Sequence, residues 1–195
     1  MARRGMADKE GKADQQPFHL ILLATDLRGY LNLCRLITDA HVDGYYYKPR
    51  IDRDHLAKHS VGLVGLSACL GGEIPRALET DDWESARRLA GQYGEIFGKD
   101  RFYLELQDHG LPEQRRLNEQ LLRLAPEVGL PLVVTNDLHY VHEGQSEAHD
   151  VLLCVGTGNN IDTPNRMKFE TTDFWLKPAA ANWSRLILVR FMKPL

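Results

Sequence analysis

The sequence predicts an α/β protein with parallel strands, and three observations support this. Apolar segments of strand length recur about every 30 to 45 residues. Segments with the apolar spacing of amphipathic helices stand between them. Several strands end abruptly in small or polar residues. Such alternation favours parallel pairing through right-handed crossovers, and four strands would make an open sheet or part of a barrel.

The elements of the first half begin after a tail. Residues 1–17 mix charges, Gly and Gln with almost no apolar content, so we expect a disordered tail. Residues 18–24 form an apolar run that predicts a strand, and Tyr30 to Ile37 have helical spacing. Residues 43–51 predict a loop with Pro49, and a short helix is expected over 54–59.

The second half repeats the pattern. Strands are predicted over 61–66, 102–107 and 132–134, and amphipathic helices over 82–97 and 112–124. A further helix is expected over 146–155, followed by an irregular, proline-interrupted segment over 162–177. Residues 179–195 change character, and the sequence assigns them no role.

Composition limits the classes of protein. The chain has 195 residues, 43% of them hydrophobic, and a net charge of −3, which suits a globular protein without the electrostatic footprint of a nucleic-acid binder. No apolar run approaches the roughly 20 residues of a membrane span, and the N-terminus lacks a secretory core, so we expect a cytoplasmic location. Three scattered cysteines are too few for a disulfide framework.

The most informative stretch is PLVVTNDLHY, residues 131–140. A short β-branched strand ends there in Asp137 and His139, whose side chains project to the same side of an extended backbone. One carboxylate and one imidazole can share a metal ion at the carboxyl end of a strand. By itself the pair is weak evidence, since a polar strand end also caps a following helix.

Residues of metal-ligand type also lie in or just after other predicted strands, and we expect them at the same carboxyl edge of the sheet. They are Cys69 after the second strand, and Asp108 and His109 after the third, which also contains Glu105. Thiolate, imidazole and carboxylate together suit zinc, or manganese or iron, in a site that activates water for phosphoester hydrolysis. Simpler interpretations stay open: Cys69 as core filler, and Asp108 and His109 as a turn before Gly110. His19 lies at the opposite end of its strand, so spacing leaves its role undecided.

Consecutive segments of the chain resemble a known family. The segments are HLILLATDLRGYLNL, GYYYKPRID, GLVGLSACLGGEIPRAL, FYLELQDHGLPEQ, LPLVVTNDLHY, AHDVLLCVGTG and NRMKFETTDFWLK. In this order over residues 18–177, they are similar to the N-terminal polymerase and histidinol phosphatase (PHP) domain of bacterial DNA polymerase III alpha subunits. The resemblance implies a distorted TIM-like α/β barrel with metal ions at its carboxyl face. In some members it implies a metal-dependent 3′ to 5′ exonuclease.

Carried over residue by residue, the resemblance implies four metal ligands. They are His19, Cys69, Asp137 and His139, with Asp137 and His139 as the catalytic candidates. Glu105, Asp108 and His109 stay outside this set as pocket or turn residues. The family's early His-x-His motif has no counterpart, because residues 1–17 contain no histidine.

The resemblance also sets expectations for domains and function. We expect an incomplete PHP domain over 18–177 that lacks its first strands, and a divergent tail over 178–195, as a truncated or frameshifted reading frame would produce. The parent would be a DNA-directed DNA polymerase, a nucleotidyltransferase of DNA replication, which contacts DNA and other holoenzyme subunits. The cofactor would be a divalent metal, zinc or manganese, and the fragment alone would be inactive. The alternatives are a free-standing PHP metallophosphoesterase and a non-catalytic scaffold.

Overall fold

The computed structural model describes residues 1–178 and residue 181. These form two compact units, which we describe separately. Unit 1 comprises Met1–Glu105 and Glu119–Val133, and unit 2 comprises Leu106–Asn118 and the described residues from Val134 onward. The predicted divergent tail falls almost entirely outside the described residues.

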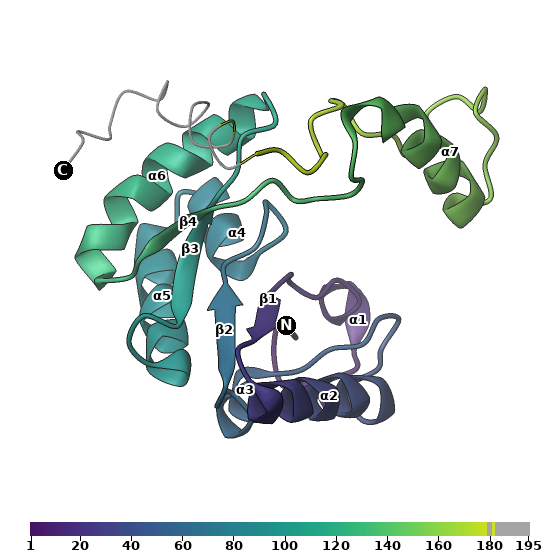
Figure 1. Cartoon of the computed structure of the whole chain (residues 1–195). Coiled ribbons are helices and arrows are strands. Elements are labelled where there is room, and N and C mark those ends of the chain that lie inside the picture. Colours follow the sequence, from purple (N-terminus) through teal and green to yellow (C-terminus); the bar gives the residue numbers. More distant parts are fainter. Residues whose placement is uncertain (179–180, 182–195) are drawn as a thin grey trace. The chain divides into compact units, whose positions relative to one another are not determined.

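One four-stranded sheet organises the chain (Figure 1). Its strands lie in the order β1-β2-β3-β4, with helices between them in the sequence. The α/β class is therefore confirmed, and an open sheet of this kind is consistent with an incomplete barrel. The strand bounds are β1 Ile21–Ala24, β2 Leu63–Leu66, β3 Phe102–Leu106 and β4 Leu132–Val134.

Parallel pairing holds for the later strands. β2 pairs with β3 in parallel, with Gly65 opposite Phe102. The backbone N–H of Leu104 donates to the carbonyl of Pro131 at 2.9 Å, and that of Thr135 to Leu106 at 3.1 Å. The register therefore advances in the same direction along β3 and the segment that contains β4, which is the parallel pattern.

β1 departs from the prediction of parallel strands. It pairs with β2 antiparallel, with Ile21 opposite Leu66 and Ala24 opposite Leu63. The chain after β1 runs through one long helix and then returns through a loop and a short helix before β2 starts. This linker brings the start of β2 beside the end of β1, so the strands run in opposite directions. The backbone N–H of Thr25 accordingly donates to the carbonyl of Gly62 at 2.9 Å.

Aspartate caps begin three of the helices. Asp26, Asp52 and Asp82 each accept a hydrogen bond from a backbone N–H three residues later, which satisfies a donor that the helix itself leaves free. The predicted helices are present, and α4 is an addition that the sequence did not indicate. Their bounds are α2 Leu27–Val42, α3 Arg53–Lys58, α4 Glu73–Glu79, α5 Trp83–Phe97 and α6 Pro112–Val128.

An aromatic stack forms the core between β3 and α5. The ring of Phe102 stacks on Tyr93 at 4.9 Å and on Phe97 at 5.6 Å between centroids. A Cβ atom at Gly65 would lie 2.7 Å from the Phe97 ring, so only glycine leaves space for this stack. The stack holds α5 against β2 and β3 and thereby positions the carboxyl ends of these strands.

Residues 1–17 have more tertiary contacts than a disordered tail would. They contain the short helix α1, Gly11–Asp14, and Asp14 is buried. The buried guanidinium of Arg50 donates to the carbonyls of Met6, Asp8 and Asp14 at 2.9–3.1 Å. Arg50, which is distant in the sequence, thus binds residues 1–17, and the composition of that segment alone does not reveal this.

Unit 2 contains the 3₁₀ helix η1, Glu143–Gln145, and helix α7, Ser146–Thr157. The guanidinium of Arg166 donates two hydrogen bonds of 2.6 Å to the carboxylate of Asp150, which ties the segment after α7 back to that helix. Across the described part of the chain, no helix combines the length and apolar character of a membrane span.

Candidate metal centre

His19 and Cys69 come together in unit 1 because β1 is antiparallel to β2. The amino end of β1 then lies beside the carboxyl end of β2, and the backbone N–H of His19 donates to the carbonyl of Gly71 at 2.9 Å. The Sγ of Cys69 lies 3.5 Å from the Nδ1 of His19. A Cβ at Gly71 would lie 2.9 Å from that nitrogen, so glycine leaves room for the ring.

The separation of these two atoms fits a shared zinc ion. A Zn–S bond of about 2.3 Å and a Zn–N bond of about 2.0 Å at a tetrahedral angle put the donor atoms roughly 3.5 Å apart. A weak S–H···N hydrogen bond has a similar length, so the distance alone permits both arrangements. The imidazole is exposed and the thiol is half-buried, which leaves the pair open to an ion from solvent.

Asp137 and His139 lie in unit 2, on the segment after β4. Asp137 has a φ of 41°, in the left-handed region, so the backbone is not extended there as the sequence argument assumed. The Nδ1 of His139 lies 2.6 Å from the carbonyl oxygen of Asp137. As a donor to that carbonyl, Nδ1 carries the proton, and Nε2 keeps its lone pair for a metal.

Aromatic rings surround the His139 side chain on several sides. Phe169 lies 4.8 Å and Phe174 5.5 Å from it, both edge-on, and His149 lies 5.4 Å away. Burial, then the neighbouring His139, lowers the pKa of His149. A pocket of about 250 Å³, lined among others by Tyr140, His149 and Phe169, adjoins this cluster.

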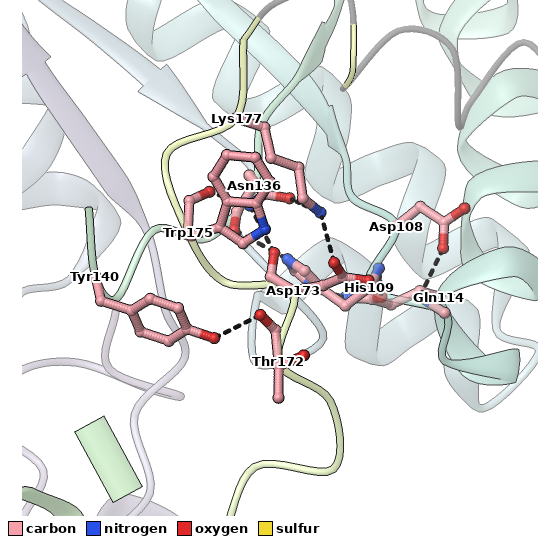
Figure 2. Close-up of polar contacts among 10 residues, drawn as sticks. Asp108, His109, Gln114, Asn136, Tyr140, Thr172, Asp173, Trp175 and Lys177 are labelled. Carbon is pink, nitrogen blue, oxygen red and sulfur yellow. Dashed lines mark hydrogen bonds and ion pairs between the residues drawn. The ribbon is translucent and has the colours of Figure 1, made fainter. Parts of the chain in front are cut away.

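A buried polar frame supports the segment that carries Asp137 (Figure 2). The side-chain amide of Asn136 donates to the carbonyls of Asp173 at 2.7 Å and Trp175 at 2.6 Å. The Nζ of Lys177 donates to the Oδ1 of Asn136 at 3.3 Å and lies 3.3 Å from the Asp173 carboxylate. The residue before Asp137 is therefore held to residues 173–177 by several hydrogen bonds.

His109 belongs to this frame, and both of its ring nitrogens face polar partners within it. It is 1% exposed, its Nε2 lies 2.9 Å from the carbonyl of Asn136, and its Nδ1 lies 2.7 Å from the Gln114 amide nitrogen. With Nε2–H donating and Nδ1 accepting, both ring nitrogens are used. The ring also stacks on Phe174 at 4.0 Å. The sequence predicted a pocket or turn role for His109, and these contacts describe what the side chain does there.

The other two pocket candidates have local roles. Asp108 accepts a hydrogen bond of 2.8 Å from the N–H of Gly110, which is the turn that the sequence suggested (Figure 2). Glu105 is 2% exposed within β3, and its backbone N–H donates to the Oγ of Ser67 at 2.9 Å. Neither geometry adds a ligand to the predicted metal set.

The buried His109 predicts a dependence of stability on pH. Burial lowers its pKa below the ordinary value of 6.5, so the unfolded chain binds this proton at a higher pH than the folded chain. The free energy of unfolding should therefore fall as the pH decreases below about 6.5. Urea unfolding at pH 7.5, 6 and 5 would measure this, and His109→Gln should flatten the decline. The exposed His41→Gln should not, and equal slopes in both variants would contradict the assignment.

A second group of ligand-type residues is not apparent from the sequence. In the part of the chain that the structure describes, Asp39, His55 and His59 have ligand atoms that all lie within 4.8 Å of one another. The spacing of the two histidines, four residues apart before the second strand, was the available signal. The sequence did not reveal that Asp39 lies near them.

Comparison with known proteins gives a consistent assignment. The sequence model of the PHP domain family matches residues 4–109. Among curated proteins, DNA polymerase III subunit alpha of Treponema pallidum is 46% identical over 82% of this chain, and that of Thermus aquaticus 45% over 87%. The protein of the same name from Borreliella burgdorferi is 43% identical over 87%. The chain spans only 14–15% of the length of these relatives.

Proposed function

Because this chain belongs to the PHP domain family, we propose that it is the metal-binding part of a DNA polymerase III alpha subunit. The name shared by the similar proteins and identities of 43–46% support this. The parent protein would be a DNA-directed DNA polymerase that acts on DNA together with other holoenzyme subunits. The chain covers the PHP region alone, so nucleotidyl transfer would belong to the rest of the parent.

The metal ligands in this proposal are His19, Cys69, Asp137 and His139. The observation that carries it is the 3.5 Å separation between the Cys69 thiol and the His19 imidazole, which suits a shared zinc ion. The tautomer of His139, set by the Asp137 carbonyl, leaves Nε2 available to a metal. Asp137 would add a carboxylate from the same segment.

The chemistry would be phosphoester hydrolysis, in the parent a 3′ to 5′ exonuclease. A bound divalent ion would lower the pKa of its water and offset phosphate charge. His19 and Cys69 would hold the ion, and the buried Asn136 frame would fix the segment that carries Asp137 and His139.

Cobalt binding tests the Cys69 ligand directly. The purified chain, freed of metal and titrated with Co²⁺, should develop thiolate-to-cobalt charge-transfer absorption. Cys69→Ala should abolish this band. Cys34→Ala removes an exposed, free cysteine of α2 and should leave it unchanged. A band that survives in Cys69→Ala would refute the ligand assignment.

We expect the isolated chain to be a poor nuclease. The four proposed ligands would hold one ion, whereas hydrolysis of this class commonly uses two ions that stabilise both the attacking and the leaving oxygen. Release of nucleotides from 3′-labelled DNA with Mn²⁺ or Zn²⁺ should stay near background, and Asp137→Ala should change it little. Rapid release that Asp137→Ala abolishes would instead favour a free-standing metallophosphoesterase.

A further inference from the structure

A carboxylate and two imidazoles meet in unit 1 on elements that the proposed function does not use. Asp39 lies near the end of α2, His55 lies in α3, and His59 is the C-cap of α3. Figure 1 shows α3 close to α2, and one hydrogen bond joins them: the Nε2 of His55 lies 2.8 Å from the Asp39 Oδ2. From this geometry we propose that Asp39, His55 and His59 bind a zinc-like divalent metal ion.

The local structure presents both imidazoles on one side of α3. Asp52 caps the helix by accepting from the backbone N–H of His55 at 2.9 Å, which fixes its first turn. Four residues further on, His59 falls on the same face, and the two ring centroids lie 5.0 Å apart. One ligand atom from each of these rings and from the Asp39 carboxylate lies within 4.8 Å of the others.

The donor set suits zinc. Two imidazoles and one carboxylate are the three protein ligands of several catalytic zinc sites, in which water takes the fourth position. The Asp39 side chain is 7% exposed and that of His55 is 18% exposed, so an ion there would be partly shielded from solvent. This set contains no sulfur and shares no residue with the set that includes Cys69.

An ion-pair network is the competing explanation for the same contacts. The Nε of Arg35 lies 2.7 Å from the Asp39 Oδ2, and this oxygen also faces His55. His59 distinguishes the two explanations. Its side chain is half-buried, packs beside the His55 ring and makes no hydrogen bond with any described residue, so a pure Arg35–Asp39–His55 network gives its ring nitrogens no partner.

Arg35 provides a discriminating variant. Its side chain is 64% exposed, so it can move into solvent when an ion occupies the cluster. Removal of its positive charge in Arg35→Gln should therefore strengthen metal binding. In a pure ion-pair network, the same change would only remove a partner of Asp39.

The test uses the full chain with Cys69→Ala as background, which removes the sulfur ligand of the other proposed site. Titration of the metal-free protein with Co²⁺ should give visible absorption without a thiolate charge-transfer band. Zn²⁺ should displace the cobalt and raise the melting temperature by mass action. Added His59→Ala or Asp39→Asn should weaken binding at least about tenfold, and Arg35→Gln should strengthen it.

The matched control is His41→Ala, which removes the exposed histidine of α2 whose Nδ1 lies 2.8 Å from the carbonyl of Ile37. It should leave cobalt affinity unchanged. The metal-free melting temperature of His59→Ala should equal that of the background, which separates loss of a ligand from loss of fold. Absence of cobalt binding, or affinity unaffected by His59→Ala, would overturn the proposal.

Discussion

Replacement of Arg50 by alanine is expected to lower the free energy of unfolding by about 3 kcal/mol or more. Its guanidinium is 1% exposed and donates to four backbone carbonyls. Hydrogen bonds from a charged donor contribute about 1.5–3 kcal/mol each when buried, and their loss leaves acceptors unsatisfied. The acceptors are the carbonyls of Gly44, Asp14, Met6 and Asp8.

The same substitution should release residues 1–17. Three of the four acceptors lie in this segment, so limited proteolysis should cut it much faster in Arg50→Ala than in the original chain. Arg87→Ala is the control, because Arg87 is an exposed arginine paired with Glu84 on the surface of α5. Urea unfolding and proteolysis that matched this control would show that Arg50 does not hold the segment.

Replacement of Gly29 by alanine is the second change with a large expected effect. The new Cβ would lie 1.8 Å from the carbonyl oxygen of Gly62, far inside contact distance. That oxygen cannot easily move, because the backbone N–H and the hydroxyl of Thr25 both donate to it, at 2.9 and 3.0 Å. We expect a loss of about 3 kcal/mol or more and disruption of the β1–β2 pairing that joins His19 to Cys69.

Gly91→Ala is the matched control for this prediction. Gly91 also lies in a helix, α5, but a Cβ there meets nothing within 4 Å. Alanine has the higher helix propensity, so the variant should be as stable as the original or more stable by up to about 1 kcal/mol. Equal melting temperatures for Gly29→Ala and Gly91→Ala would contradict the close approach of α2 to Gly62.

Local patterns predicted the regular elements well and the irregular ones poorly. The strands that contain Leu63, Phe102 and Leu132, and the long amphipathic helices, follow from apolar periodicity alone. Helix α4 was missed because it is short, has Gly72 as an N-cap without a side-chain hydrogen bond and contains Pro75 in its first turn. These features resemble a loop in sequence, and packing against α5 decides that they form a helix.

The sequence also identified residues better than it identified their roles. It selected His109 as a polar residue at a strand end, but only the folded chain shows both ring nitrogens used within a buried frame. Conversely, nothing in the sequence relates Asp39 to His55 and His59, since sixteen or more residues separate the carboxylate from the imidazoles. The convergence of His19 and Cys69 with Asp137 and His139 stays a prediction.

The sequence by itself determined the α/β alternation, the positions of the four strands and the family, because periodicity and motifs are properties of neighbouring residues. Only the tertiary structure decided the direction of β1. Strand direction depends on where the intervening chain places the start of the second strand, and a local pattern does not record this. If β1 were parallel to β2, His19 would lie at the opposite end of the sheet from Cys69. Because β1 is antiparallel, His19 lies next to Cys69.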